Sequence, residues 1–364
     1  MLAVLDGPAN ASSVHAEGRA ARGIVEEARR TLANLAGAEP QNVIFTSGAT
    51  EANTLALSPS LQVNGRSSSY RALFVSAIEH PSVLAGGRFP PDAIKTLPVG
   101  PDGRVDTEAV RQVLAGVERP LVSVMLANNE TGVVQPVRTV AEIVHAADGL
   151  LHVDAVQAAG RIPIRMTELG ADLLTLSSHK FGGPQGAGAL LYRSGIAVAP
   201  LVRGGGQERG FRAGTENVAA IAGFGAAAAA ALAELETSAA RMGRLRDRLE
   251  AELRALTPDL AIFGSGTERL PNTSLVAIPG TKAETAVIAF DLNGIALSSG
   301  AACSSGKVQP SHVLAAMAVA PGLARAALRI SLGPTTTETD LERLLTAWKG
   351  VVSSLRKGMP GLAA

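Results

Sequence analysis

Lysine and aspartate side chains that could hold a reactive cofactor follow apolar segments of this chain. Lys180 stands in "SSHKFGGPQGAG", next to His179 and before a glycine-rich turn. A lysine beside a second cation in a partly desolvated pocket has a lowered pKa and can react with an aldehyde, although an isolated lysine is more often a surface charge. Asp154 stands in "DAVQ", with Gln157 one helical turn later. A buried acid needs a partner, and a protonated ring nitrogen is a suitable one.

The segment "SGATEAN" could bind a phosphate. Gly48 allows a tight turn after an apolar run, and the backbone N–H groups of a helix start, with the Thr50 hydroxyl, could face phosphate oxygens. By itself this pattern is more often an ordinary turn. Taken together, however, a lysine for an aldehyde, an aspartate for a ring nitrogen and a helix start for a phosphate describe pyridoxal phosphate. The set is far more specific than any one of its members.

Two other polar segments stand at similar positions. His80 lies in "AIEHPSV", before a proline that fixes the turn, where a single histidine is more often structural. The segment "NNETG" contains Asn128, Asn129 and Glu130, which could be turn residues or could orient a bound ring.

Cys303 is the only cysteine of the 364 residues, and it lies in "SSGAACSSG". A lone thiol usually packs as a small hydrophobe, but serine and glycine neighbours offer little apolar surface for that. One cysteine cannot form an internal disulfide or a cysteine-based metal site, which favours a reducing compartment such as the cytoplasm.

The elements that must position these residues alternate along the first two-thirds of the chain. Short apolar runs predict strands at 42–46, 71–76, 121–127, 150–154, 172–177 and 188–193, and helical patterns fall between them at 14–36, 106–115 and 137–147. This alternation indicates parallel strands joined by crossovers and therefore the α/β class. Ligands of such sheets bind beyond the carboxyl ends of the strands, which is where the polar segments fall.

Beyond about residue 215 the pattern changes to one long helix that runs to about residue 256 and would bridge two domains. The remainder predicts a smaller α+β domain, whose last helix begins with Thr337 and Asp340 in capping-box spacing. We expect a large cofactor-binding domain at 12–245 and a small domain formed by 1–11 and 246–364.

Composition excludes several classes of partner. The net charge is +1, from 33 basic and 32 acidic residues, so there is no electrostatic footprint for nucleic acid or an anionic membrane. The longest apolar stretch, "AIAGFGAAAAAALAELE", is alanine-rich and amphipathic and is a poor membrane span. The first twenty residues lack the features of a signal peptide. We expect a soluble cytoplasmic protein with small-molecule or protein partners.

The chain resembles a known family over about residues 10 to 335. The matching segments, in the family's order, are "FTSGATEAN", "EHPSV", "NNETGVVQP", "HVDAVQAAGRIPI", "LSSHKFGGPQGAGALL", "GGGQERGFRAGTEN", "SSGAACSSG" and "RISLG". They resemble the pyridoxal-phosphate-dependent cysteine desulfurases, which are fold type I enzymes of the class V aminotransferase group, and among them the subgroup similar to NifS and IscS. The resemblance implies a large domain with a mostly parallel seven-stranded sheet sandwiched by helices, plus a smaller α+β domain.

The resemblance also implies roles for the cofactor-contacting residues. Lys180 would hold pyridoxal phosphate covalently, Asp154 would pair with its ring nitrogen and Gln157 would approach its phenolic oxygen. His80 would stack on the ring and shuttle protons. The remaining cofactor contacts would come from Ala49, Thr50, Asn129, Ser177, His179 and, across the interface of a homodimer, Thr215.

For substrate and product, the resemblance implies that Asn129 and Arg329 hold the carboxylate of L-cysteine, the arginine as a bidentate fork. Cys303 would take the substrate sulfur as a persulfide, with His80 as the candidate base for its thiol, and alanine would leave. The persulfide would pass to an acceptor protein of iron–sulfur cluster assembly or of a thiolation pathway. No metal site is expected, apart from Cys303 as a transient cluster ligand.

The sequence departs from the family at its start. Relatives begin with a strand, an Asp-x-x-x-x-Thr-Pro turn and a helix before the segment that here reads "NASSVHAEGRAARG". We expect "MLAVLDGPAN" to be the end of that helix, so that the N-terminal part of the small domain would be shortened. In relatives this part lines the substrate pocket.

Two alternatives keep part of this interpretation. Another class V aminotransferase or a selenocysteine lyase would use Lys180 and Asp154 but would not need Cys303 as a sulfur relay. A weakly active scaffold that binds pyridoxal phosphate would fit the shortened start. A nicotinamide-binding fold is disfavoured, because no G-x-G-x-x-G follows the first strand.

Overall fold

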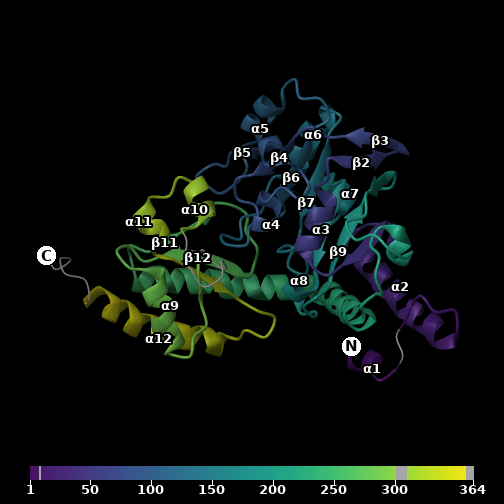
Figure 1. Cartoon of the computed structure of the whole chain (residues 1–364). Coiled ribbons are helices and arrows are strands. Elements are labelled where there is room, and N and C mark those ends of the chain that lie inside the picture. The colour runs from purple at the N-terminus through teal and green to yellow at the C-terminus, as the bar shows by residue number, and fades with distance from the viewer. Residues whose placement is uncertain (8–9, 301–309, 358–364) are drawn as a thin grey trace. The chain divides into compact units, whose positions relative to one another are not determined.

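The computed structural model describes residues 1–7, 10–300 and 310–357, and it divides into two compact units (Figure 1). The first unit comprises Met1–Pro98, Val105–Leu126 and Gln135–Leu235. The second comprises Val99–Arg104, Ala127–Val134 and Glu236–Ala364. The division differs from the expected domains: residues 1–11 belong to the first unit, the boundary in the long helix comes ten residues earlier, and two short internal segments join the second unit. A sequence pattern that is read in chain order does not reveal that short internal segments belong to the other unit.

A seven-stranded sheet forms the centre of the first unit. Its strands are β1 (Val43–Thr46), β4 (Leu73–Ser76), β5 (Ile94–Leu97), β6 (Leu121–Met125), β7 (Leu150–Asp154), β8 (Leu173–Ser177) and β9 (Gly188–Tyr192), in the spatial order β1-β9-β8-β7-β6-β4-β5. Strands β5, β4, β6, β7 and β8 pair in parallel, and only β9 runs against its two neighbours. The expected mostly parallel seven-stranded sheet is confirmed.

The burial of each strand explains whether it can be predicted from the sequence. Strands β6 to β9 are buried at every position, as is typical of sheet strands covered on both faces, and they read as largely apolar runs. The edge strand β5 reads "IKTL" and has two exposed positions, so it has no apolar run and is missing from the predicted strands. A three-stranded sheet of β2 (Ser60–Val63), β3 (Arg66–Ser69) and β10 (Ile196–Val198) is also missing from the predicted strands. Strands β2 and β3 contain few apolar residues, and the apolar β10 is only three residues long.

Helices connect and cover the strands of the first unit. They are α1 (Leu2–Leu5), α2 (Ala16–Ala36), α3 (Ala49–Ala56), α4 (Pro81–Leu84), α5 (Thr107–Leu114), α6 (Val137–Ala146) and α7 (Met166–Leu169). Helix α3 packs against β8 and β9, and α6 packs against β6 and β7. The three helices predicted here correspond to α2, α5 and α6, with ends that agree within two residues.

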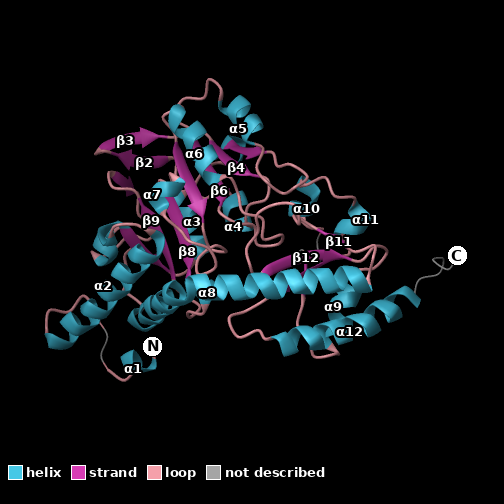
Figure 2. Cartoon of the chain, turned by 180° about the vertical axis from the view of Figure 1, so that it is seen from behind, coloured by secondary structure: helices cyan, strands magenta, loops and turns pink. Residues whose placement is uncertain are grey.

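The second unit is built on an antiparallel sheet with the order β11-β12-β14-β13. Its elements are β11 (Ala261–Ile262), β12 (Thr273–Ala277), β13 (Ser298–Ser299), β14 (Ala327–Ser331), α9 (Ala283–Asp291), α10 (His312–Ala316), α11 (Pro321–Ala324) and α12 (Glu338–Lys357). Helix α9 packs against α12 and β14 (Figure 2), around the fully buried Trp348 and Phe290. The backbone N–H and hydroxyl of Thr337 donate to Asp340, and the Asp340 N–H returns a bond to Thr337, so the predicted capping box is present.

Helix α8 (Val218–Leu256) is the long helix that the sequence predicts. By length and apolar composition alone it could cross a membrane, contrary to the expectation from its alanine content. Within the first unit its Phe224 is fully buried and contacts the rings of Phe45 and Phe181. Within the second unit its Leu249 and Leu253 belong to the core. These contacts are those of a core helix.

Candidate active site

Six strands of the large sheet end at the same edge. Because β1, β4, β5, β6, β7 and β8 run in the same direction, their carboxyl ends lie together. Their last residues are Thr46, Ser76, Leu97, Met125, Asp154 and Ser177. The first unit therefore gathers at one edge the segments that the sequence singled out.

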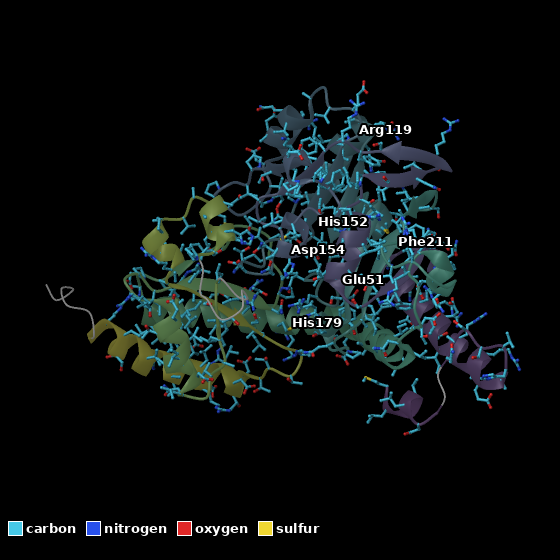
Figure 3. The ribbon with its side chains drawn as sticks, in the orientation of Figure 1. Glu51, Arg119, His152, Asp154, His179 and Phe211 are labelled. Atoms are coloured by element: carbon cyan, nitrogen blue, oxygen red, sulfur yellow. The ribbon has the colours of Figure 1, made fainter. Side chains whose placement is uncertain are left out.

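Asp154 ends β7 as a buried carboxylate, two residues after the buried His152 (Figure 3). Burial raises its pKa, which is opposed by hydrogen bonds from the Asn53 side chain and the Val156 N–H, both at 3.0 Å, and by the positive charges of His80 and Lys180. These interactions favour the charged form. A protonated ring nitrogen would supply the remaining compensation.

Lys180 lies on η3 (Ser178–Phe181), the single turn that directly follows β8. Its carbonyl accepts a hydrogen bond from Arg161 at 2.8 Å, which fixes the backbone of the turn. Burial lowers the pKa of His179, and the charge of Lys180 lowers it further. The Nδ1 atom of His179 lies 3.0 Å from the hydroxyl of Ser177. Because its pKa is lowered, His179 favours its neutral form, and the expected role of a second cation beside Lys180 stays a prediction.

His80 is the N-cap of α4, where Pro81 occupies the first helical position. Its Nδ1 atom accepts the backbone N–H of Ser82 at 3.1 Å and lies 2.8 Å from the Ser82 hydroxyl. His80 therefore has the structural role that the sequence left open. This role does not exclude a chemical one, because the charge of His80 also favours the charged form of Asp154.

The start of α3 presents backbone donors to open space. Gly48 is its N-cap, no side chain caps it, and a Cβ built on Gly48 would meet nothing within 4 Å. A Cβ on Gly188 would lie only 2.5 Å from the carbonyl carbon of Gly48, so β9 passes this turn at a distance that only glycine permits. Ala49 and Thr50 form the first turn of the helix, and their N–H groups can bind an anion there.

These groups fit pyridoxal phosphate. A buried carboxylate suits the ring nitrogen, a lysine on the adjacent strand end suits the aldehyde, and an uncapped helix start suits the phosphate. Gln157 lies three residues after Asp154, where its carbonyl and side-chain oxygens accept hydrogen bonds from Arg161. Its predicted contact with the cofactor stays a prediction.

The second unit brings the two predicted substrate residues together. Arg329 on β14 donates from Nη1 to the carbonyl oxygen of Asn129 at 2.8 Å. Next to them, the buried carboxylate of Glu130 lies 2.5 Å from the hydroxyl of Ser311, and burial raises the pKa of Glu130 to about 7 while Ser311 and Arg329 act against the shift. Arg329 and Asn129 are thus held in one arrangement by contacts within this unit.

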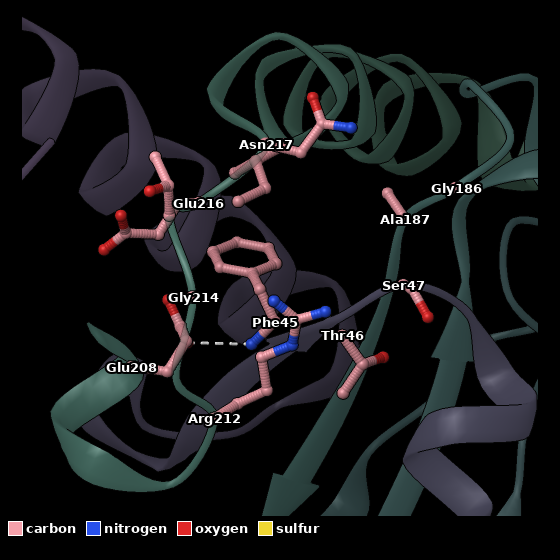
Figure 4. A pocket seen from close by; sticks show the side chains of 12 residues that line it. Phe45, Thr46, Ser47, Gly186, Ala187, Glu208, Arg212, Gly214, Glu216 and Asn217 are labelled. Atoms are coloured by element: carbon pink, nitrogen blue, oxygen red, sulfur yellow. Dashed lines mark hydrogen bonds between the residues drawn. The ribbon is translucent and has the colours of Figure 1, made fainter. Parts of the chain in front are cut away.

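Thr215 lines a cavity of about 190 Å³ in the first unit (Figure 4). The other lining residues include Thr46 and Ser47, which lead into α3, and Glu208 and Arg212. Arg212 pairs with Glu51 on the first turn of α3 at 3.0 Å. The expected contribution of Thr215 to a neighbouring subunit stays a prediction. Cys303 lies outside the described residues.

Three polar residues near Asp154 were missed by the sequence analysis. Asn53 is fully buried on α3, Ser82 follows the N-cap of α4, and Glu79 is fully buried beside His80. Burial and the charge of Asp154 raise the pKa of Glu79, whose Oε1 accepts the Met125 N–H at 2.7 Å. The only available signal was a polar residue on the inner face of a short helix, and that signal is weak without the fold.

The sheet topology, with an aspartate, a lysine and an uncapped helix start at one edge, defines a fold type I enzyme that uses pyridoxal phosphate. The Aminotransferase class-V family profile matches residues 4–344. A cysteine desulfurase of Cereibacter sphaeroides is 45% identical over 96% of this chain and 90% of its own length, and the cysteine desulfurase IscS of Dictyoglomus turgidum is 38% identical over 96% and 89%. The crystal structure of a NifS-like protein from Rickettsia africae superposes with a TM-score of 0.86 at 35% identity, covering 97% of this chain and 94% of that one.

The chain therefore belongs to the class V aminotransferase family and, within it, to the pyridoxal-phosphate-dependent cysteine desulfurases. The fold, the family and the cofactor expected from the sequence are confirmed.

Proposed function

We propose that this chain takes the sulfur atom from L-cysteine, leaves L-alanine, and carries the sulfur on Cys303 as a persulfide. The observation that supports this most directly is the buried Asp154 carboxyl group: burial raises its pKa, while hydrogen bonds from Asn53 and Val156 and the charges of His80 and Lys180 favour its charged form. A carboxylate with that surrounding is suited to keep a pyridine nitrogen protonated.

The residues at the strand ends have different roles in the proposed reaction. Pyridoxal phosphate, when bound, supplies an electron sink for the pair released when the substrate loses its α-proton. Lys180 would hold the cofactor, and its free amine would be the base for that proton. The backbone N–H groups at Ala49 and Thr50, with the side chains of Ser177 and His179, hold the phosphate.

Arg329 and Asn129 bind the substrate carboxylate. The guanidinium offers a planar fork of N–H donors that matches a carboxylate, and its Nη1 bond to the Asn129 carbonyl sets the plane of the fork. Binding the carboxylate in this way fixes the position of the substrate α-carbon relative to Arg329 and Asn129. An amino acid that lacks the α-carboxylate would lose this anchor.

The sulfur transfer balances without another oxidant. The thiolate of Cys303 attacks the substrate sulfur, a sulfur–sulfur bond forms, and the bond from sulfur to the substrate β-carbon breaks. The β-carbon gains a hydrogen and is reduced, while the transferred sulfur is oxidised to the sulfane level. The products are L-alanine and the Cys303 persulfide.

The wider setting of the reaction is also part of the proposal. The enzyme acts as a cytoplasmic homodimer in which Thr215 contacts the cofactor phosphate of the neighbouring subunit. An acceptor protein then takes the persulfide sulfur for iron–sulfur cluster assembly or thiolation. The IscS-named relatives support the cluster pathway, and the near-zero net charge of +1 gives no support to a nucleic-acid partner.

The test is a paired assay of alanine and sulfide with pyridoxal phosphate, L-cysteine and a reductant. Wild type should release both products in equal amounts. Cys303→Ser should still bind the cofactor, with its yellow colour, but release almost no sulfide, and Lys180→Ala should release neither product. Lys95→Ala, which removes an exposed lysine that bonds only to the nearby Asp92 carbonyl, is the matched control and should behave as wild type.

Two outcomes would contradict the proposal. Wild-type sulfide release from Cys303→Ser would remove the relay role and favour a selenocysteine lyase or another class V enzyme. Bound cofactor without alanine or sulfide from wild type would favour a scaffold. Size measurement of the cofactor-loaded protein tests the homodimer separately, and a monomer with full activity would refute it.

A further inference from the structure

Two side chains that the proposed reaction does not use, Asn53 and Ser82, connect His80 to Asp154. The Nδ2 atom of Asn53 lies 3.0 Å from Asp154 Oδ2 and 2.9 Å from the Ser82 hydroxyl oxygen. That hydroxyl in turn lies 2.8 Å from His80 Nδ1. The result is a continuous path of hydrogen bonds from His80 to Asp154, and all of it lies within the first unit.

The direction of each hydrogen bond in this path can be assigned. A charged carboxylate only accepts, so the Asn53 amide must turn its NH₂ group toward Asp154. The same NH₂ group has a second hydrogen, which it donates to the Ser82 oxygen. The hydroxyl hydrogen of Ser82 is then available for His80 Nδ1, in line with the 2.8 Å separation.

A second contact fixes the histidine independently. The backbone N–H of Ser82 lies 3.1 Å from the same Nδ1 atom, as the cap of α4. A backbone N–H cannot accept a hydrogen bond, so Nδ1 must offer its lone pair. In the neutral ring the proton therefore resides on Nε2.

We propose that Asn53 and Ser82 are positioning residues that hold His80 as its Nε2–H tautomer through a directed chain of hydrogen bonds beginning at Asp154. In this state Nε2 carries the ring proton, so it donates a hydrogen bond and cannot take a proton, and Nδ1 is already bonded to Ser82. The neutral ring therefore enters the reaction as a hydrogen-bond donor through Nε2, and the proton of Cys303 must leave by another route.

The first test needs neither cofactor nor substrate. Protein labelled with ¹⁵N only in its histidines is examined by long-range ¹H–¹⁵N correlation at a pH where the ring is neutral, and His80→Gln identifies the signal among the six histidines. We expect one unprotonated Nδ1 and one protonated Nε2 for His80. A protonated Nδ1 in the wild-type protein would overturn the inference, whether or not the enzyme is active.

The second test measures kinetics and, for this consequence only, rests on the proposed function. Ser82→Ala keeps the backbone cap but removes the hydroxyl, and we expect kcat to fall about tenfold with KM within about twofold, since the Nε2–H hydrogen-bond donor loses its orientation. Ser82→Thr, which restores a hydroxyl, should recover most of kcat. Thr54→Ala is the matched control, because that hydroxyl, one residue from Asn53, donates to the Thr50 carbonyl of its own helix.

A double-mutant cycle tests the connection itself. If Asn53 and Ser82 act through one path, the Asn53→Ala/Ser82→Ala double variant should lose no more kcat than the worse single variant. Multiplied losses would mean independent roles and would refute the path. Melting of the cofactor-free variants separates a folding defect in Asn53→Ala, whose side chain is fully buried, from a kinetic one. The histidine spectrum and the measurement of alanine formation are independent of each other. The spectrum can refute the inference while the proposed function stands, and alanine formation can refute the proposed function while the inference stands.

Discussion

The hydroxyl of Ser311 lies 2.5 Å from a carboxylate oxygen of Glu130, and both side chains are buried. Ser311 also caps α10 by accepting the Leu314 N–H at 3.0 Å. One serine therefore fixes both the helix start and a carboxylate that neighbours Asn129 and faces Arg329. The arrangement ties the substrate-binding residues of the second unit to its fold.

Replacing Glu130 by glutamine should make stability less dependent on pH. Burial raises the folded-state pKa of Glu130 to about 7 from an ordinary 4.5. Its contribution to stability is complete below about pH 4.5 and is lost as the pH rises through 7, a change of about 3 kcal/mol. Glu130→Gln keeps an acceptor for Ser311 and never ionises, so its stability relative to wild type should increase between pH 5 and 8. Urea unfolding at both pH values measures this, and a difference that does not change with pH would contradict the expectation.

Replacing Asp154 by asparagine should abolish most of the activity without unfolding the chain. The amide is neutral and has one acceptor oxygen, which can serve either the Asn53 side chain or the Val156 N–H, so the charge and one of the two hydrogen bonds are lost. We expect kcat to fall by about a hundredfold or more, since a carboxylate that keeps the ring nitrogen protonated is lost. Steady-state alanine formation measures this loss. Asp148→Asn is the control, because that side chain is 90% exposed and precedes the same strand. Equal activity of the two variants would refute the role of Asp154.

His152 should control stability on the acid side. Its ring is fully buried between the hydroxyls of Ser123 and Thr175, at 2.8 and 3.0 Å, and burial lowers its pKa to about 3. The contribution is present above pH 6.5 and is lost as the pH falls toward 3, on the order of 4 kcal/mol in full. Equilibrium unfolding of His152→Gln between pH 7 and 4 should therefore give a flatter profile than wild type. An exposed replacement, His15→Gln, should follow the wild-type profile, and a His152→Gln profile as steep as wild type would assign the acid loss to other groups.

The ion pair between Arg29 and Glu208 should be costly to break. Two parallel bonds of 2.8 Å join the side chains, both are buried, and Glu208 also accepts the Phe45 N–H at 2.8 Å. Glu208 and Arg209 have φ values of 45° and 58°, which non-glycine residues adopt only when held. We expect Glu208→Gln to lower the free energy of unfolding by about 3 kcal/mol, because Arg29 would keep an uncompensated buried charge.

The control for that variant is Glu26→Gln, which removes the second, half-exposed carboxylate on the same arginine. Surface pairs contribute little, so a loss below about 1 kcal/mol is expected. Denaturant unfolding compares the two variants, and a similar loss in both would mean that burial does not decide the strength of the pair. Because the segment at Glu208 leads to Thr215, the Glu208 variant should also weaken any dimer that depends on Thr215.

The sequence by itself determined the buried strands at the centre of the large sheet, the main helices and the residues whose types could do chemistry. Strands β6 to β9 are mostly apolar, because both of their faces are covered. The capping box of Thr337 and Asp340 predicts the start of α12 from the local sequence alone. Lys180 and Asp154 were recognisable because each follows an apolar run and because their types complement one cofactor. The count of seven strands came from the resemblance, since β5 carries too few apolar residues to be seen.

Only the tertiary structure decided which polar groups meet. Asn53 and Asp154 are 101 residues apart in sequence, Arg29 and Glu208 are 179 apart, and Glu130 and Ser311 are 181 apart. No local pattern encodes such pairs, because each is created when crossovers bring distant strand ends and loops together. The raised pKa of Glu130 and the lowered pKa of His152 depend on burial in the same way. The sequence therefore shows which side chains are available for the chemistry, whereas the fold determines the charge and the hydrogen-bond direction of each.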